Sequence, residues 1–115
     1  MSDVTIYHNP KCSKSRQTLA LLESRGIDAK VVHYLDQPPS KVELKALLSK
    51  LNLSAADIIR RAEQAFEAID DNADEETLLD AMVSDPILIQ RPIVMRGDRA
   101  CLGRPPENVL SLLDD

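Results

Sequence analysis

The chain has 115 residues and a formal net charge of −5 at pH 7, which suits one domain and disfavours nonspecific nucleic-acid binding. One Phe, two Tyr and no Trp provide few rings for stacking on bases or sugars. No stretch approaches the ~20 apolar residues of a membrane helix, and the N-terminus lacks a signal-peptide pattern. We therefore expect a cytoplasmic monomer with a single domain over residues 1–115, and no nucleic-acid or membrane partner.

The first third of the sequence predicts a strand, a helix and a second strand. Val4-Thr5-Ile6-Tyr7 is β-branched and aromatic and leads into a proline turn, which is typical of a short buried strand. A helix is expected over 16–25, and Gly26 ends it. Residues 30–35 predict the next strand, with His33 inside it as a structural residue. Strand, helix and strand imply a right-handed parallel crossover.

The middle of the sequence predicts a helical insertion at about 40–84. The segment Ser40-Lys41-Val42-Glu43 is a capping box, and the leucines that follow keep the i, i+3, i+4, i+7 rhythm of an amphipathic helix. Ser54-Ala55-Ala56-Asp57 opens a shorter helix. Another helix is expected to start near 72–74 and to stop before a proline.

The last third predicts a β-hairpin and a closing helix. Strands are expected over 92–95 and 99–102, joined by a tight turn at Gly97-Asp98. Pro105-Pro106 suits the first turn of the helix that follows. The order βαβ, helices, ββα predicts an α/β, thioredoxin-like domain with a four-stranded mixed sheet. In that fold Arg91-Pro92 would be a cis-proline facing the active cysteine.

Cys12 is the first candidate for chemistry, because it falls at or just before a helix N-terminus. Unpaired N–H groups and the helix dipole favour an anion there, which lowers a thiol pKa and makes the thiolate reactive. Ser15 stands where the second cysteine of a Cys-x-x-Cys pair would be, so an outside thiol or a distant one must resolve any disulfide. A Cys-x5-Arg phosphatase loop starting at Cys12 would need an arginine at position 18. The chain has Thr18 there, so this loop is absent. Two separated cysteines predict no metal site.

Four arginines and the second cysteine are further candidates for a role at the site. Arg91 lies between an apolar run and Pro92, where a charge is costly unless it serves a pocket, and Arg104 lies between Gly103 and Pro105 at a strand-to-helix corner. Periodicity alone does not choose between Arg60 and its neighbour Arg61. Cys101 alternates with apolar residues in a strand, which favours a buried structural thiol, although a resolving role stays open.

The segment His8-Asn9-Pro10-x-Cys12-x-x-Ser15-Arg16-x-Thr18-Leu19 resembles the active-site signature of the glutaredoxin-coupled arsenate reductase (ArsC) family. Further matches follow over nearly the whole chain, at Tyr34-Leu35, Pro38-Pro39-Ser40, Ile58-Ile59-Arg60, the run from Pro86 to Val94, and Arg104-Pro105.

The resemblance implies a substrate, partners and residue roles. Arsenate would enter an arginine-lined pocket at the first helix, where Arg60, Arg91 and Arg104 bind the oxyanion and His8 helps to lower the pKa of Cys12. Backbone N–H groups over 13–15, which include Ser13 and Lys14, would meet the oxyanion as well. The Cys12 thiolate would form a thiol–arsenate adduct. Glutathione would act as co-substrate and glutaredoxin as partner, with no bound cofactor.

Two alternatives from other classes remain open. One is a redox-sensing transcription regulator that binds RNA polymerase. Such regulators often carry Cys-x-x-Cys, so Ser15 counts against this hypothesis. The other is a glutathione-dependent thiol oxidoreductase acting on disulfides, in which the arginines would hold glutathione carboxylates.

Overall fold

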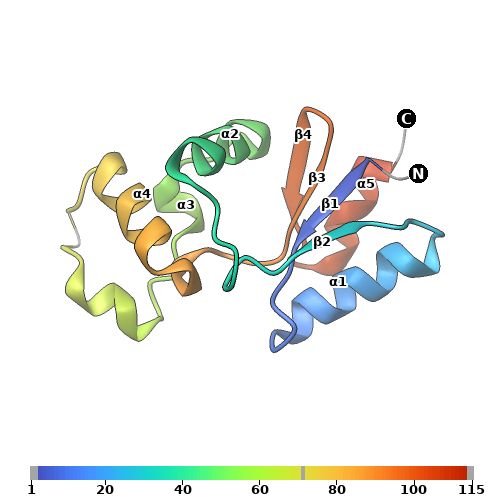
Figure 1. Cartoon of the computed structure of the whole chain (residues 1–115), viewed down its shortest axis with the longest axis horizontal. Coiled ribbons are helices and arrows are strands. Elements are labelled where there is room, and N and C mark those ends of the chain that lie inside the picture. Colours follow the sequence, from blue (N-terminus) through green and yellow to red (C-terminus); the bar gives the residue numbers. More distant parts are fainter. Residues whose placement is uncertain (1–2, 71, 114–115) are drawn as a thin grey trace. The chain divides into compact units, whose positions relative to one another are not determined.

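A computed structural model of the chain describes residues 3–70 and 72–113. They divide into two compact units, which are described separately: Met1–Gln37 with Arg91–Asp115, and Pro38–Gln90. In the first unit (Figure 1) the elements, with η for a 3-10 helix, are β1 (Val4–Tyr7), α1 (Ser13–Ser24), β2 (Lys30–Val32), β3 (Ile93–Arg96), β4 (Arg99–Leu102), η3 (Pro106–Val109) and α5 (Leu110–Leu113). Those of the second unit are α2 (Lys41–Leu51), α3 (Ala55–Ile58), η1 (Gln64–Ala68), α4 (Glu75–Ser84) and η2 (Pro86–Leu88).

The first unit is built on a four-stranded mixed sheet with the strand order β2-β1-β3-β4. β1 runs parallel to β2, with Ile6 opposite Val31, and antiparallel to β3, with Ile6 opposite Val94. β3 and β4 form the predicted hairpin, whose turn carries Gly97 at φ +60°. Because β1 and β2 are parallel, their carboxyl ends lie at the same edge of the sheet, where the chain also enters α1.

Helices α1, η3 and α5 supply apolar side chains to the core of the first unit, as Figure 1 shows for α1 and α5 beside the sheet. The leucines of α1 face this core, with Leu22 fully buried and Leu19 and Leu21 packed against it. The buried residues of this cluster are Val4, Ile6, Leu22, Val94, Val109 and Leu112. This packing fixes the start of α1 relative to the end of β1.

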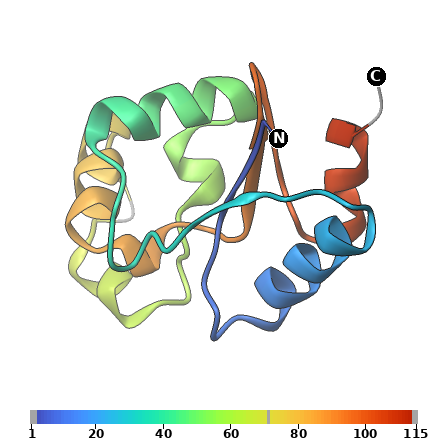
Figure 2. The same cartoon turned by 45° about the vertical axis from the view of Figure 1, so that its right-hand side comes forward.

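The second unit is helical (Figure 2) and spans Pro38–Gln90, where the sequence predicted an insertion at about 40–84. The predicted capping box is present at the start of α2, where Glu43 N donates to Ser40 Oγ and Ser40 N donates to Glu43 Oε1. Lys41 Nζ joins α2 to α4 through Glu76 (2.6 Å) and Asp80 (2.8 Å). These groups are exposed, so solvent screens each pair and its contribution to stability is small.

Several element boundaries differ from the sequence predictions. Helix α1 begins at Ser13, three residues earlier than expected, because the carbonyl of Cys12 already accepts the N–H of Arg16. β2 ends at Val32, so the prediction of His33 inside a strand was wrong: its carbonyl accepts the N–H groups of Asp36 and Gln37 and starts a turn. The short helices η1 and η2 were not predicted. Among the described residues, none of the helices has the length and apolar character needed to cross a membrane.

Candidate active site

Cys12 is the N-cap residue of α1, at the edge of the sheet where β1 ends. A tight turn leads into it, in which Cys12 N donates to the carbonyl of Asn9 at 3.0 Å. Lys11 N donates to Asn9 Oδ1 at 3.0 Å, and Arg16 Nη1 donates to the carbonyl of Pro10 at 2.8 Å. One backbone hydrogen bond and two that involve the side chains of Asn9 and Arg16 therefore stabilise this turn. It delivers the sulfur to the first turn of the helix, as the sequence predicted.

The surroundings of Cys12 favour its thiolate. Burial alone would raise the pKa of the thiol, but the N–H of Ser15, the Arg91 guanidinium and the N–H of Lys14 outweigh it. The pKa of Cys12 therefore lies below the ordinary value for cysteine. Lys14 contributes through its backbone N–H, while the part expected of Ser13, the exposed first residue of α1, stays a prediction. A partly exposed thiolate at a helix N-terminus is a competent nucleophile.

Arg104 and Arg91 come together beside Cys12, although 79 or more residues separate each from it in the sequence. Arg104 Nη1 lies 3.9 Å from Cys12 Sγ and donates to the carbonyl of Arg91 at 3.1 Å. Both arginines precede a cis-proline, at Arg91-Pro92 as predicted and at Arg104-Pro105, which was not anticipated. Two guanidiniums beside a thiolate supply positive charge and hydrogen-bond donors of the kind that suits an anion.

Close packing between Gly103 and α1 holds the Arg104 segment in place. A Cβ at Gly103 would lie 2.6 Å from Thr18 Oγ1 and 2.7 Å from Pro92 Cγ, so only glycine fits without displacement. Gly103 N also donates to the carbonyl of Pro92 at 2.9 Å. The sequence prediction missed this contact. Its only sequence signal was the dipeptide Gly103-Arg104 before a proline.

His8 contacts Ser15, while the role expected of His8 in lowering the pKa of Cys12 stays a prediction. His8 Nδ1 lies 2.6 Å from Ser15 Oγ, and Asn9 N donates to the same oxygen at 3.0 Å, all three residues being buried. Burial, followed by the charges of His33 and Arg16, lowers the pKa of His8, so its imidazole is neutral at pH 7. Ser15 Oγ therefore has two partners, the Asn9 N–H that it accepts and the imidazole Nδ1, and the imidazole tautomer decides the donor of the second bond. This bond fixes Ser15, whose own N–H lowers the pKa of Cys12.

Arg60 belongs to the second unit, so its part in oxyanion binding stays a prediction. It lies two residues after the end of α3, and Arg60 N donates to the carbonyl of Leu88 at 2.7 Å. Its Nε lies 3.6 Å from Glu63 Oε1, a partner that the sequence reasoning did not identify. The Arg61 guanidinium lies over the Phe66 ring, 5.2 Å from its centroid. That contact supports the choice of Arg60 over Arg61 as the candidate ligand.

Cys101 has the character of a structural thiol. Its Sγ donates to the carbonyl of Asn108 at 3.6 Å, and burial raises its pKa to about 11. A thiol with that pKa is protonated at pH 7 and is a poor resolving nucleophile. In residues 3–70 and 72–113 no group of three or more His, Cys, Asp or Glu side chains is arranged to hold a metal ion.

Comparison with known proteins places this fold and site in a family. Residues 7–112 match the model of the ArsC family. An arsenate reductase of Neisseria meningitidis serogroup A is 44% identical over 117 residues, which cover 98% of this chain and 100% of that protein. The uncharacterised Escherichia coli protein YfgD is also 44% identical, over 114 residues and 96% of each chain.

A solved structure of an arsenate reductase from Vibrio cholerae is similar with a TM-score of 0.90 and 46% sequence identity, covering 94% of this chain and 95% of that one. Together with the sheet order β2-β1-β3-β4, this confirms the predicted α/β, thioredoxin-like fold. The chain belongs to the ArsC family.

Proposed function

We propose that this protein is an arsenate reductase that uses Cys12 as its nucleophile and takes its electrons from glutathione and glutaredoxin. The observation that carries the proposal is the position of Arg104 Nη1, 3.9 Å from a sulfur whose pKa is already lowered. A nucleophile and an anion-binding site therefore coincide. Relatives named arsenate reductase at 44% and 46% identity support arsenate as the anion.

In the first step the Cys12 thiolate attacks the arsenic of arsenate. The S–As bond forms and one As–O bond breaks, and the departing oxygen gains protons and leaves as water. Arsenic stays pentavalent in this adduct. Arg91 and Arg104 offset the negative charge as thiolate and oxyanion approach, and the N–H groups at the start of α1 add to this stabilisation. Arg60 is the third guanidinium that the proposal assigns to the oxyanion.

In the second step the glutathione thiolate attacks the Cys12 sulfur. An S–S bond forms, and the electron pair of the broken S–As bond stays on arsenic, which leaves as arsenite. A glutaredoxin thiolate then attacks the glutathione sulfur of the mixed disulfide and frees Cys12. The need for outside thiols is supported by Ser15, whose hydroxyl is bound to His8, and by the raised pKa of Cys101. Glutathione and a stable thiolate suit the reducing cytoplasm.

The test is arsenate-dependent oxidation of NADPH coupled through glutathione, glutathione reductase and glutaredoxin. Cys12→Ser should abolish it, and Cys101→Ser should retain it. Omitting glutathione should stop turnover after the adduct has formed, which intact mass spectrometry detects. Turnover of a glutathionylated peptide without any turnover of arsenate would instead show a thiol oxidoreductase acting on disulfides.

A further inference from the structure

A small cavity lies beside the loop that carries Cys12, separate from the arginines described above. It has a volume of about 190 Å³ and is lined by residues 8–11 from that loop and by His33, Leu35 and Asp36 from the turn after β2. Arg91 and Arg104 are not among its lining residues. An anion held by those two side chains would therefore leave the cavity free for a second ligand.

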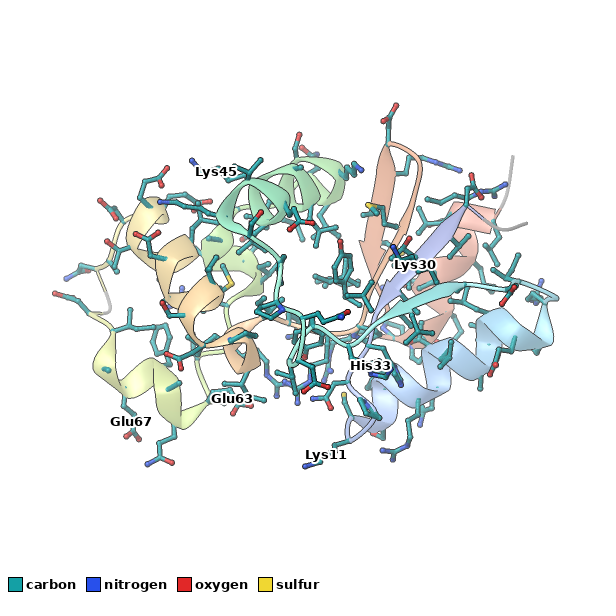
Figure 3. All side chains as sticks on the ribbon, viewed as in Figure 1. Lys11, Lys30, His33, Lys45, Glu63 and Glu67 are labelled. Atoms are coloured by element: carbon teal, nitrogen blue, oxygen red, sulfur yellow. The ribbon has the colours of Figure 1, made fainter. Side chains whose placement is uncertain are left out.

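The cavity has ordered walls at the carboxyl ends of two parallel strands. His8 N donates to the carbonyl of Val32 at 2.9 Å, which extends the pairing of β1 and β2 into the loop. The carbonyl of His33 accepts two N–H groups, from Asp36 (3.0 Å) and Gln37 (2.9 Å), and fixes the opposite wall. In open α/β sheets, ligands bind at this edge of the strands. Figure 3 shows Lys11 and His33 at the same end of this unit, where β1 leads into α1.

The residues that line the cavity provide a positive charge, a negative charge and apolar surface. Lys11 and Asp36 are exposed side chains of opposite charge, and His33 adds an imidazole ring. Pro10 and Leu35 supply apolar surface. Drug-sized ligands fill cavities of roughly 300–1,000 Å³, so a cavity of about 190 Å³ takes only the end of a larger ligand. An end group with one ammonium and one carboxylate matches these charges, which is the chemistry of a free amino-acid terminus.

We propose that this cavity binds the γ-glutamyl end of glutathione during the resolution of the Cys12 adduct. The inference rests on the proposed function and adds a binding site to it. Asp36 would receive the α-ammonium group, and Lys11 with His33 would receive the α-carboxylate. Lys11 directly precedes Cys12 in the chain, so the cysteinyl residue of a glutathione anchored here would lie next to the nucleophile loop. The glycyl end has a carboxylate but no ammonium group and matches the cavity less well.

The decisive variant is Asp36→Asn, with Asp28→Asn as its control. Asp28 is also an exposed aspartate of the first unit, but it precedes β2 and does not line the cavity. We expect Asp36→Asn to raise KM for glutathione by about 2- to 5-fold, the effect of losing one exposed charge pair, while KM for arsenate stays the same. Asp28→Asn should leave both constants unchanged. An unchanged KM for glutathione in Asp36→Asn would overturn the proposal.

A glutathione analogue without the α-amino group provides the second comparison. The wild-type protein should prefer glutathione over this analogue, and Asp36→Asn should lose most of that preference. Equal use of both thiols by the wild-type protein would contradict the assignment of Asp36.

Two measurements separate this proposal from the proposed function. Formation of the Cys12 adduct from arsenate, followed by mass spectrometry without any thiol, tests the reductase chemistry alone. Binding of S-methylglutathione, which cannot react, tests the cavity alone through NMR shifts of the Asp36 and His33 amides. An adduct without such shifts would overturn the cavity and leave the reductase in place. Shifts without an adduct would support the cavity and reject the reductase.

Discussion

Arg104 Nη1 lies 3.9 Å from Cys12 Sγ, and the same nitrogen donates to the carbonyl of Arg91 at 3.1 Å. The carbonyl holds the guanidinium against the sulfur before any substrate is present. Such preorganisation is what stabilises charge during an attack on an oxyanion, because the protein need not reorganise at that moment. The contact also brings the last loop of the chain to the first helix.

Replacing Arg104 should therefore impair substrate binding more than folding. Its side chain is exposed, and Arg104→Gln removes a charged hydrogen-bond donor worth about 1.5–3 kcal/mol. We expect kcat/KM for arsenate to fall by roughly 10- to 150-fold with little change in the midpoint of urea unfolding. Arg104→Lys should recover only part of the loss, since an ammonium lacks the planar fork. Full activity in Arg104→Gln would remove this arginine from the site.

Arg91 should control the titration of the nucleophile. Its guanidinium is the side chain that lowers the pKa of Cys12, so Arg91→Gln should move the pH midpoint of Cys12 alkylation upward. Iodoacetamide rates measured between pH 5 and 10 give that midpoint. Arg25→Gln, at the opposite end of α1, is the control and should leave it in place. A midpoint that does not move in Arg91→Gln would assign the lowered pKa to the helix N–H groups alone.

The two thiols should differ strongly in reactivity. The pKa of Cys12 is lowered, whereas that of Cys101 is raised to about 11. Because the thiolate is the reactive form, iodoacetamide at pH 7.5 should label Cys12 on the order of 100-fold faster than Cys101. Peptide mapping after short exposures measures both rates in one sample. Comparable labelling of both cysteines would contradict the structural role of Cys101.

Local sequence patterns predicted those parts of the fold that depend on neighbouring residues. The Ser40–Glu43 capping box and the Gly97 turn each involve residues within four positions, and both are present. β2 was predicted three residues too long, because Val31, Val32 and Tyr34 favour a strand by type. The turn that ends it depends on the His33 carbonyl, a backbone contact that residue types do not reveal.

The sequence predicted individual residues of the candidate site but not the contacts that join them. A cysteine at a helix start follows from local pattern, and the family signature pointed to Arg91 and Arg104. The contact of Ser15 with His8 and that of Gly103 with Thr18 join α1 to the segments that follow β1 and β4. Periodicity contains no information about such contacts, which follow from how the helix packs on the sheet.

The neutral state of His8 predicts a pH dependence of stability. Its pKa is lowered in the folded protein, first by burial, then by His33 and Arg16. A lowered folded-state pKa contributes stability that is present above the unfolded value of about 6.5 and is lost as pH falls through the folded value. The free energy of unfolding should therefore decline in acid below pH 6.5. His8→Asn places a polar side chain that does not titrate beside Ser15, so it should flatten this decline. A parallel decline in both proteins would refute the assignment to His8.

Gly103→Ala tests whether close packing positions Arg104. The new Cβ would meet Thr18 Oγ1 and Pro92 Cγ within 2.7 Å, so the segment must shift. Overpacking of this kind costs typically about 1–3 kcal/mol, and the shift should carry Arg104 away from Cys12 Sγ. We expect the unfolding midpoint and kcat/KM for arsenate to fall together. Thr18→Ala in the same chain removes the nearest contact and should restore part of both.

Gly97→Ala is the control that separates stability from site geometry. Gly97 has φ +60° in the hairpin turn, where an alanine is strained by roughly 1 kcal/mol, and a Cβ there meets nothing within 4 Å. This variant should lose stability without losing kcat/KM, because its strain lies at the far end of the hairpin from Arg104. If both glycine variants lower kcat/KM in proportion to lost stability, the activity loss reflects partial unfolding. A larger loss in Gly103→Ala than in Gly97→Ala at equal stability assigns it to the displaced guanidinium.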